Sequence, residues 1–266
     1  MEHKNLHSYN NYEIFDDKII EDSYKISKLK SSDCHVNFIE KIFKRKNLRV
    51  VELGSGNSKT LFNLSLKNIL NHGFGFEISN TRHSFAETWK NELGIKNVTN
   101  VLDNFLSLGN YNISDVDLFF LSDLSFQFCE PISVGAEKKL LSRIYNDLND
   151  DGKLILELDG CGKVISSIDL NSKIWEEFDI NDPWQFSLWN CNYDKKTNFL
   201  NWDKTFISRR GDKRDFTSVT LKIYNKEEIE KLLVETGFKK INFYQNWDFD
   251  SFKSDKSEFI VLAEKF

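Results

Sequence analysis

A short apolar run that breaks into two glycines most constrains how this chain can fold. The run spans 48–53 and carries one acidic residue, Glu52, just before Gly54, Ser55 and Gly56. A pattern typical of a helix begins directly afterwards. This order predicts a buried parallel strand, a tight turn and a helix N-terminus, the usual start of a nucleotide-type site in an α/β sheet. Glycine permits unusual backbone angles and lets a ligand approach the main chain closely.

This turn differs from a dinucleotide-binding fingerprint both in its acidic residue and in its glycine spacing. That fingerprint would place a third glycine three residues after Gly56, where this chain has Lys59. Glu52 to Ser58 instead resembles motif I of class I S-adenosylmethionine-dependent methyltransferases, E/D-x-G-x-G-x-G, with Ser58 in place of the last glycine. The resemblance implies an α/β fold with a Rossmann-like seven-stranded sheet and helices on both faces. It also implies S-adenosyl-L-methionine as cofactor and S-adenosyl-L-homocysteine as product.

A second apolar run, 73–78, ends in Glu77 and Ile78. In a βαβ unit of this size, such a glutamate arrives at the carboxyl edge of the strand beside the first one. A carboxylate there can accept both ribose hydroxyl protons, so we predict that Glu77 and Ile78 bind cofactor. The alternative interpretation of Glu77 is a charge that stabilises the N-terminus of the next helix.

A third run, 97–102, delivers Asp103, Asn104 and Phe105 to the same edge. The resemblance implies that Asp103 accepts a hydrogen bond from the adenine amino group, and that Asn104 and Phe105 line the ring. The alternative for Asp103 is a cap on the following turn.

The candidate catalytic groups are Asp123 and His83. Asp123 follows a fourth apolar run, 116–121, and is the leading candidate for a base; His83, on a helix predicted over 80–93, is the second. A turn cap and a surface histidine are the respective alternatives. Methyl transfer from a sulfonium is an in-line displacement of an activated donor, so it needs positioning and desolvation more than a catalytic triad or a metal. No metal site is predicted.

A β-rich insertion is predicted after the fifth strand, 153–158. Helix and strand stop alternating after Cys161, and 184–203 alternates apolar and polar residues around a turn typical of a hairpin. We assign 180–216 as an antiparallel insertion on the acceptor side. Its aromatic stripe either walls an acceptor pocket or packs on the core, and its arginines either grip an anionic acceptor or lie in a solvated loop. These residues are Trp184, Trp189, Trp202, Arg209, Arg210 and Arg214.

The C-terminal part returns to an α/β pattern. Asn225 and Glu228 form a predicted capping box, Gly237 ends that helix, and a closing antiparallel strand pair follows over 239–244 and 258–263. The resemblance covers 48–160 and 217–266. We therefore expect an N-terminal arm or lid over 1–30, with a frayed terminus as the alternative, and one methyltransferase domain over 31–266.

Composition argues against several other classes of protein. The formal net charge is −5 with no basic block, which disfavours a nucleic-acid groove, and the apolar runs are far shorter than a membrane span. No secretory signal pattern is present, and the four cysteines form no CxxC pair, which favours reduced thiols in the cytoplasm.

The sequence therefore predicts a methyltransferase for a small metabolite, such as a sugar or natural-product intermediate, with O-methylation favoured. An anionic acceptor is one option. We expect no nucleic-acid or membrane partner and a monomer or homodimer. The alternatives are a protein or RNA methyltransferase, and a non-catalytic subunit that binds S-adenosylmethionine.

Overall fold

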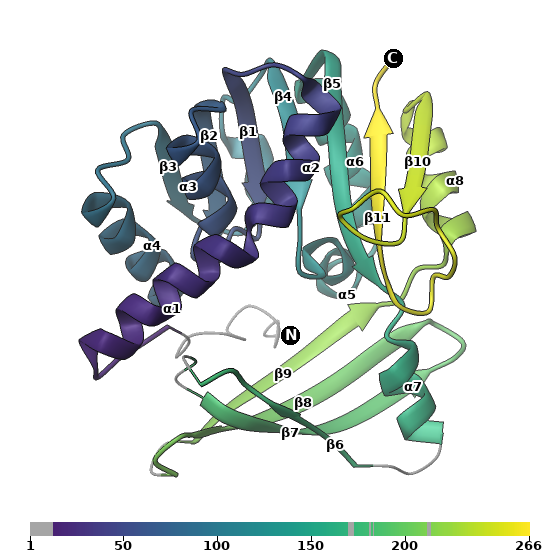
Figure 1. The fold of residues 1–266 in the computed structure, drawn as a ribbon. Helices are drawn as coiled ribbons and strands as arrows, with labels where there is room; N and C mark the ends of the chain where they lie inside the picture. The colour runs from purple at the N-terminus through teal and green to yellow at the C-terminus, as the bar shows by residue number, and fades with distance from the viewer. Residues whose placement is uncertain (1–12, 170–172, 181, 183, 212–213) are drawn as a thin grey trace.

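Two separate sheets build the molecule (Figure 1). A computed structural model describes residues 13–169, 173–180, 182, 184–211 and 214–266. The larger sheet has seven strands in the order β10-β11-β5-β4-β1-β2-β3, and the smaller has four in the order β6-β7-β8-β9. The smaller sheet lies below the C-terminal ends of the parallel strands in Figure 1.

The seven-stranded sheet is parallel except for one strand. β11 runs antiparallel to both of its neighbours, β5 and β10. The predicted closing pair at the C-terminus is therefore confirmed. The strands are β1 (Leu48–Leu53), β2 (Leu70–Glu77), β3 (Val98–Leu102), β4 (Val116–Leu121), β5 (Leu148–Asp159), β10 (Lys240–Tyr244) and β11 (Glu258–Glu264).

Helices cover both faces of this sheet, as predicted. Alternate residues of each strand point to opposite faces, so Val50 and Phe120 pack with one helical layer while Val51 and Phe119 pack with the other. The first layer contains α2 (Asp33–Phe43), α3 (Lys59–Leu66) and α4 (Asn80–Glu92). The second contains α6 (Ala136–Asp147) and α8 (Lys226–Thr236). The predicted Rossmann-like architecture is confirmed.

The N-terminal region is largely helical where the structure describes it. α1 (Lys18–Ser31) begins at Asp17, whose side chain accepts hydrogen bonds from the next helical N–H groups, and it leads directly into α2. Tyr24 of α1 is only 3% exposed, and α1 contacts α3. The part of the expected 1–30 arm that precedes residue 13 lies outside the described residues.

The predicted insertion after β5 is confirmed, with wider bounds than expected. β7 (Trp184–Asp194) and β8 (Phe199–Ser208) form the predicted hairpin. β8 pairs over its whole length with β7 and over 199–207 with β9 (Arg214–Lys222). The insertion also includes α7 (Gly162–Asp169) and β6 (Ile174–Glu177).

One buried glutamine holds both ends of this insertion. Gln127 lies in η3 (Ser125–Phe128), is fully buried, and donates from Nε2 to the carbonyl oxygens of Asp159 and Lys222 at 3.1 and 3.0 Å. Its Oε1 accepts from the Asp159 N–H at 2.9 Å. The chain therefore leaves β5 and returns from β9 at nearly the same point, with Gln127 between them.

The sequence of residues 149–152, Asn-Asp-Asp-Gly, predicts a turn before the fifth strand, and this prediction is wrong. These residues belong to β5, where the pairing with β4 jumps from Val116 opposite Leu148 to Leu118 opposite Lys153. The extra residues form an irregularity inside the strand rather than a connection before it. Among the helices that the structure describes, none combines the length and the apolar character that crossing a membrane requires.

Candidate functional site

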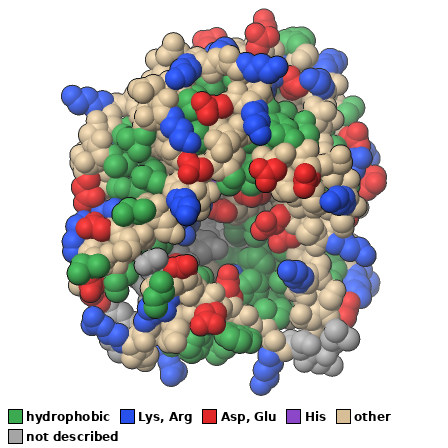
Figure 2. All heavy atoms as spheres, viewed as in Figure 1, with side chains coloured by type: hydrophobic (Ala, Val, Ile, Leu, Met, Phe, Trp, Pro, Cys, Tyr) green, Lys and Arg blue, Asp and Glu red, His purple; other side chains and the backbone are tan. Residues whose placement is uncertain are grey.

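A cavity of about 290 Å³ opens at the C-terminal edge of the parallel strands. Figure 2 shows that the viewed face is hollowed near its centre, with side chains of both charge signs around the hollow. The cavity walls come from the ends of β1, β2 and β4, the segment after β3, α1, and the short helices η3 and α5 (Cys129–Ile132). Predicted site residues among the lining are Glu52, Gly54, Ser55, Gly56, Glu77, Ile78, Asn104, Phe105 and Asp123.

The turn after β1 requires its two glycines. Gly54 and Gly56 have φ values of +79° and +55°, in the region that side chains disfavour. A Cβ on Gly54 would lie 2.3 Å from Ser125 Oγ, and one on Gly56 would lie 2.6 Å from an Arg82 guanidinium nitrogen. The backbone of the turn therefore forms part of the cavity wall where no side chain would fit.

Glu52 is a buried carboxylate that faces this cavity. It is 2% exposed, and its Oε2 has no hydrogen-bond partner among the residues that the structure describes. Burial raises the pKa of Glu52 to about 8, against the opposing effect of the Lys59 charge. A cationic or hydrogen-bond-donating ligand at this position would satisfy the carboxylate and favour its ionised form.

Glu77 connects the end of β2 to the glycine turn. Its Oε2 accepts from the Gly56 N–H at 2.8 Å and its Oε1 accepts from the Ser79 N–H at 2.7 Å. Each oxygen keeps lone pairs that a ligand hydroxyl could use. Glu77 therefore shapes the turn and also lines the cavity beside the exposed Ile78.

The segment after β3 contributes Asn104 and Phe105 to the cavity, but not Asp103. The Asp103 carboxylate accepts from the Asn104 N–H at 2.7 Å and from the Tyr111 hydroxyl at 2.8 Å. Those two bonds fix the turn that carries Asn104 and Phe105. In this structure Asp103 is therefore placed as a support for the cavity wall rather than as part of it.

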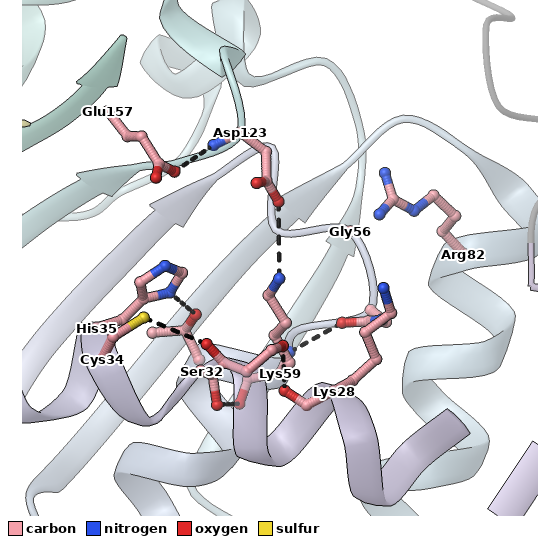
Figure 3. A network of polar contacts seen from close by, with 12 residues as sticks. Lys28, Ser32, Cys34, His35, Gly56, Lys59, Arg82, Asp123 and Glu157 are labelled. Carbon is pink, nitrogen blue, oxygen red and sulfur yellow. Dashed lines mark hydrogen bonds and ion pairs between the residues drawn. The ribbon is translucent and has the colours of Figure 1, made fainter. Parts of the chain in front are cut away.

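The two candidate bases lie in different places. Asp123 lines the cavity with 71% of its side chain exposed, and Lys59 Nζ lies 3.8 Å from its Oδ2 (Figure 3). The Lys59 charge lowers the pKa of Asp123, so this carboxylate is ionised and weakly basic. His83 is not among the lining residues, and its Nε2 lies 3.4 Å from the Asn100 carbonyl oxygen.

Three cationic side chains in the cavity wall were missed by sequence reasoning: Lys28, Lys59 and Arg82. Figure 3 shows Lys59 pointing toward Asp123, with Lys28 beside it. Burial, followed by repulsion from Lys59, lowers the pKa of Lys28. Lys28 stands in an ordinary lysine-containing helix pattern, so nothing in the sequence alone distinguishes it from solvated neighbours.

Glu13 ties the segment before α1 to the glycine turn. It accepts from the Tyr24 hydroxyl at 2.7 Å and from Asn57 Nδ2 at 2.6 Å, and its Oε2 lies 3.6 Å from Arg82 Nε. These contacts hold α1 against the mouth of the cavity. They give a physical basis to the predicted covering role of the N-terminal region, which stays a prediction.

The three tryptophans and three arginines singled out in the insertion, all of which the structure describes, are not among the residues that line the cavity. Lys204 Nζ lies 3.5 Å from the Trp189 ring centre and 4.9 Å from that of Trp202, in a cluster that packs against α7. Arg209 donates to the carbonyl oxygens of Phe178 and Asp182. Among the residues that the structure describes, no three His, Cys, Asp or Glu side chains gather as metal ligands would, and all four cysteines are free.

Comparison with solved structures identifies the fold. No protein-family model and no curated protein matches the sequence. A methyltransferase dependent on S-adenosylmethionine from Clostridium acetobutylicum matches with a TM-score of 0.72 and 19% identity, over 88% of this chain and 89% of that one. The CcbJ methyltransferase from Streptomyces caelestis matches with a TM-score of 0.71 and 14% identity, over 87% and 94%.

A third match is CalS10 from Micromonospora echinaspora, an amino pentose methyltransferase of calicheamicin biosynthesis solved with S-adenosylmethionine bound. Its TM-score is 0.63 at 11% identity, over 95% of this chain and 99% of that one. All three identities are low, so the likeness concerns architecture. The chain has the fold of solved S-adenosylmethionine-dependent methyltransferases.

Proposed function

We propose that this protein binds S-adenosyl-L-methionine and transfers its methyl group to a small-molecule acceptor. The observation that carries the proposal is Glu52, a buried carboxylate with an unpartnered oxygen, beside a glycine turn that leaves room for a ligand. The three structural matches support the same assignment, since each is described as a methyltransferase. When bound, the cofactor supplies an activated methyl group on a sulfonium.

The residues of the cavity suit the parts of that cofactor. Glu52 would bind the ammonium group, and Glu77 would accept hydrogen bonds from the ribose hydroxyls. Asn104 and Phe105 would contact the adenine ring. Asp103 holds their turn in place, so we assign it a positioning role instead of a direct adenine contact.

Three N–H groups of the glycine turn are already hydrogen-bonded and are not free to bind the carboxylate of the methionine portion. The N–H groups of Gly54 and Ser55 both donate to the Phe76 carbonyl oxygen, and that of Gly56 donates to Glu77. Lys28 and Lys59 are two of the three cationic side chains that line the cavity. We therefore assign them to the methionine carboxylate, which would offset their mutual repulsion.

The acceptor atom depends on what Asp123 can do as a base. A hydroxyl acceptor must lose its proton during transfer, whereas an amine can reach the site already neutral. The sequence favours oxygen, and Asp123 in the cavity wall supports that choice. Its lowered pKa and the position of His83 outside the cavity favour an amine instead, so N-methylation is the second candidate.

Calorimetry with S-adenosylmethionine and S-adenosylhomocysteine tests the cofactor assignment. We expect wild type to bind both, and Glu77→Gln to bind them about 10-fold or more weakly, since a charged hydrogen bond to a ribose hydroxyl contributes about 1.5–3 kcal/mol. Glu235→Gln, which changes an exposed glutamate of α8, is the matched control and should bind like wild type. Failure of wild type to bind at millimolar ligand would refute the proposal.

Transfer assays with Asp123→Asn separate the two acceptor atoms. With hydroxyl acceptors we expect turnover to fall about 10-fold or more while cofactor affinity stays within about 3-fold. With amines, turnover should instead rise with pH as the free amine deprotonates, equally in both proteins. Unchanged turnover of Asp123→Asn on a hydroxyl acceptor would remove Asp123 as the base.

A further inference from the structure

The outer face of the four-stranded sheet carries an exposed apolar row. Cross-strand pairing places Trp175, Leu188, Thr205 and Phe216 side by side, one on each strand from β6 to β9. Trp175 and Phe216 are each 61% exposed and Leu188 is 48% exposed. The opposite face of the same sheet is buried against α7 and the core of the molecule, as Leu200 and Trp202 show. A contiguous exposed row of this kind is typical of an interaction surface.

A second row on the same face carries charges at its two ends. It consists of Glu177, Phe186, Ile207 and Arg214, again one residue from each strand. Glu177 stands on one edge strand of the sheet, β6, and Arg214 on the other, β9. Both side chains are exposed, and within the described parts of the chain neither has an ion-pair partner. The row is therefore acidic at one edge, apolar in the middle and basic at the other edge.

We propose that this face is the interface of a homodimer, with the twofold axis parallel to the strands. Rotation about such an axis places β6 against β9 of the second copy and β7 against β8. Positions along the strands do not change, so each row lies opposite the same row of the second copy. Trp175 then faces Phe216 of the other copy, and Glu177 faces Arg214. Each contact occurs twice, as an isologous interface requires.

Charge pairing distinguishes this axis from one perpendicular to the strands. An axis in the plane of the sheet but perpendicular to the strands would lay β6 on β6 and β9 on β9. Glu177 would then lie at the β6 edge of the other copy, and Arg214 at its β9 edge, so that neither residue meets the opposite charge. Of these two axes, the one parallel to the strands pairs opposite charges while it also stacks the two apolar rows. Aligned packing of two sheets in this way is common in proteins.

Sedimentation equilibrium with charge-reversal variants tests this inference. Wild type should behave as a dimer of the 31.2 kDa chain at micromolar concentration. Glu177→Arg and Arg214→Glu should each raise the dimer dissociation constant at least 10-fold. The double variant should restore it to within about 3-fold of wild type, because the opposite charges again face each other. A double variant as weak as the single ones would overturn the inference.

An apolar-to-acidic pair of variants checks the same face independently. Phe216→Asp should make the protein monomeric, whereas Val234→Asp, which changes an apolar residue of α8 that is 58% exposed, should leave the dimer intact. Both positions are exposed, so circular dichroism should show unchanged folding. A monomeric wild type at 100 micromolar, or equal behaviour of the two variants, would refute the interface. Because no measurement here involves cofactor or acceptor, the outcome is independent of the proposed methyl transfer.

Discussion

The two sheets of this molecule bury their residues in different ways. In the seven-stranded sheet all six residues of β4 are buried, because helices cover both faces. In the four-stranded sheet one face is covered and the other is open, so Leu200 is fully buried and Leu188 is 48% exposed. The first sheet ends in a cavity, and the second presents a surface. The proposed cofactor site therefore lies at the first sheet, and the proposed dimer interface lies on the second.

The residues that line the cavity support this difference between the two sheets. Among the described residues that line it, all come from the part of the chain up to Ile132, and none comes from β6 to β9. The role of the insertion on the acceptor side therefore stays a prediction. Its observed contribution is a buried aromatic face toward α7 and an open face toward solvent.

The largest expected effect concerns cofactor binding at the seven-stranded sheet, when a methyl group is added at Gly54. Gly54→Ala should weaken cofactor binding at least 100-fold, about 3 kcal/mol, since its Cβ meets Ser125 at 2.3 Å. Gly94→Ala is the matched control: its φ is also positive, at +67°, but nothing lies within 4 Å of the added atom. Calorimetry should find its affinity unchanged. Equal losses in the two variants would mean that backbone strain, not closeness to the site, explains the effect.

Two identical leucine truncations test the difference between the faces of the four-stranded sheet. Leu200→Ala should lower the free energy of unfolding by about 2–3 kcal/mol, because it leaves a cavity in a buried cluster. Leu188→Ala should lower it by less than about 1 kcal/mol. Urea unfolding should be measured in the Phe216→Asp background, so that dimerisation does not contribute. Similar losses would show that the outer face is packed within one chain.

The smallest effect concerns the pH dependence that Glu52 gives to stability. Because its folded pKa of about 8 lies above the unfolded value of 4.5, the folded state binds the extra proton between these values. Stability is therefore present at low pH and is lost as pH rises through about 8. Glu52→Gln should remove this loss, which is on the order of 1 kcal/mol between pH 7 and pH 8.5.

Urea unfolding of wild type and Glu52→Gln at several pH values measures that difference. Glu137 and Glu157, whose pKa values burial raises to about 7, titrate in both proteins and cancel in the comparison. Parallel pH profiles would mean that Glu52 is ionised at neutral pH without a ligand.

Sequence alone predicted the seven-stranded sheet well because its signals are local. The run 116–121 is apolar throughout, as a strand covered on both faces must be, and its predicted bounds agree with β4. The capping box of Asn225 and Glu228 was also predicted and is present. The glycine turn and the glutamate at the end of β2 were located for the same reason, since each follows a strand with an unambiguous pattern.

The rest depended on contacts between distant segments. No local pattern shows that Lys28 of α1 reaches a cavity formed by β1 and β4, or that Asp103 turns away to meet Tyr111. The alternation in 184–203 predicted a hairpin but not which face would be covered, because that depends on α7 and on the return of β9. Sequence periodicity reports that a strand has two faces, and tertiary packing decides their use.

The hydrogen bonds that Gln127 makes to both ends of the insertion have a consequence for how the insertion can vary. One side-chain nitrogen bonds to both Asp159 and Lys222, so the sixty-odd residues between them form a loop with joined ends. Closing a longer or shorter loop at the same two points changes the entropic cost only slowly. We expect that a segment of different length or sequence could replace the residues between these two anchor points while β5 and α8 keep their places. One recognition surface could then be exchanged for another at this position.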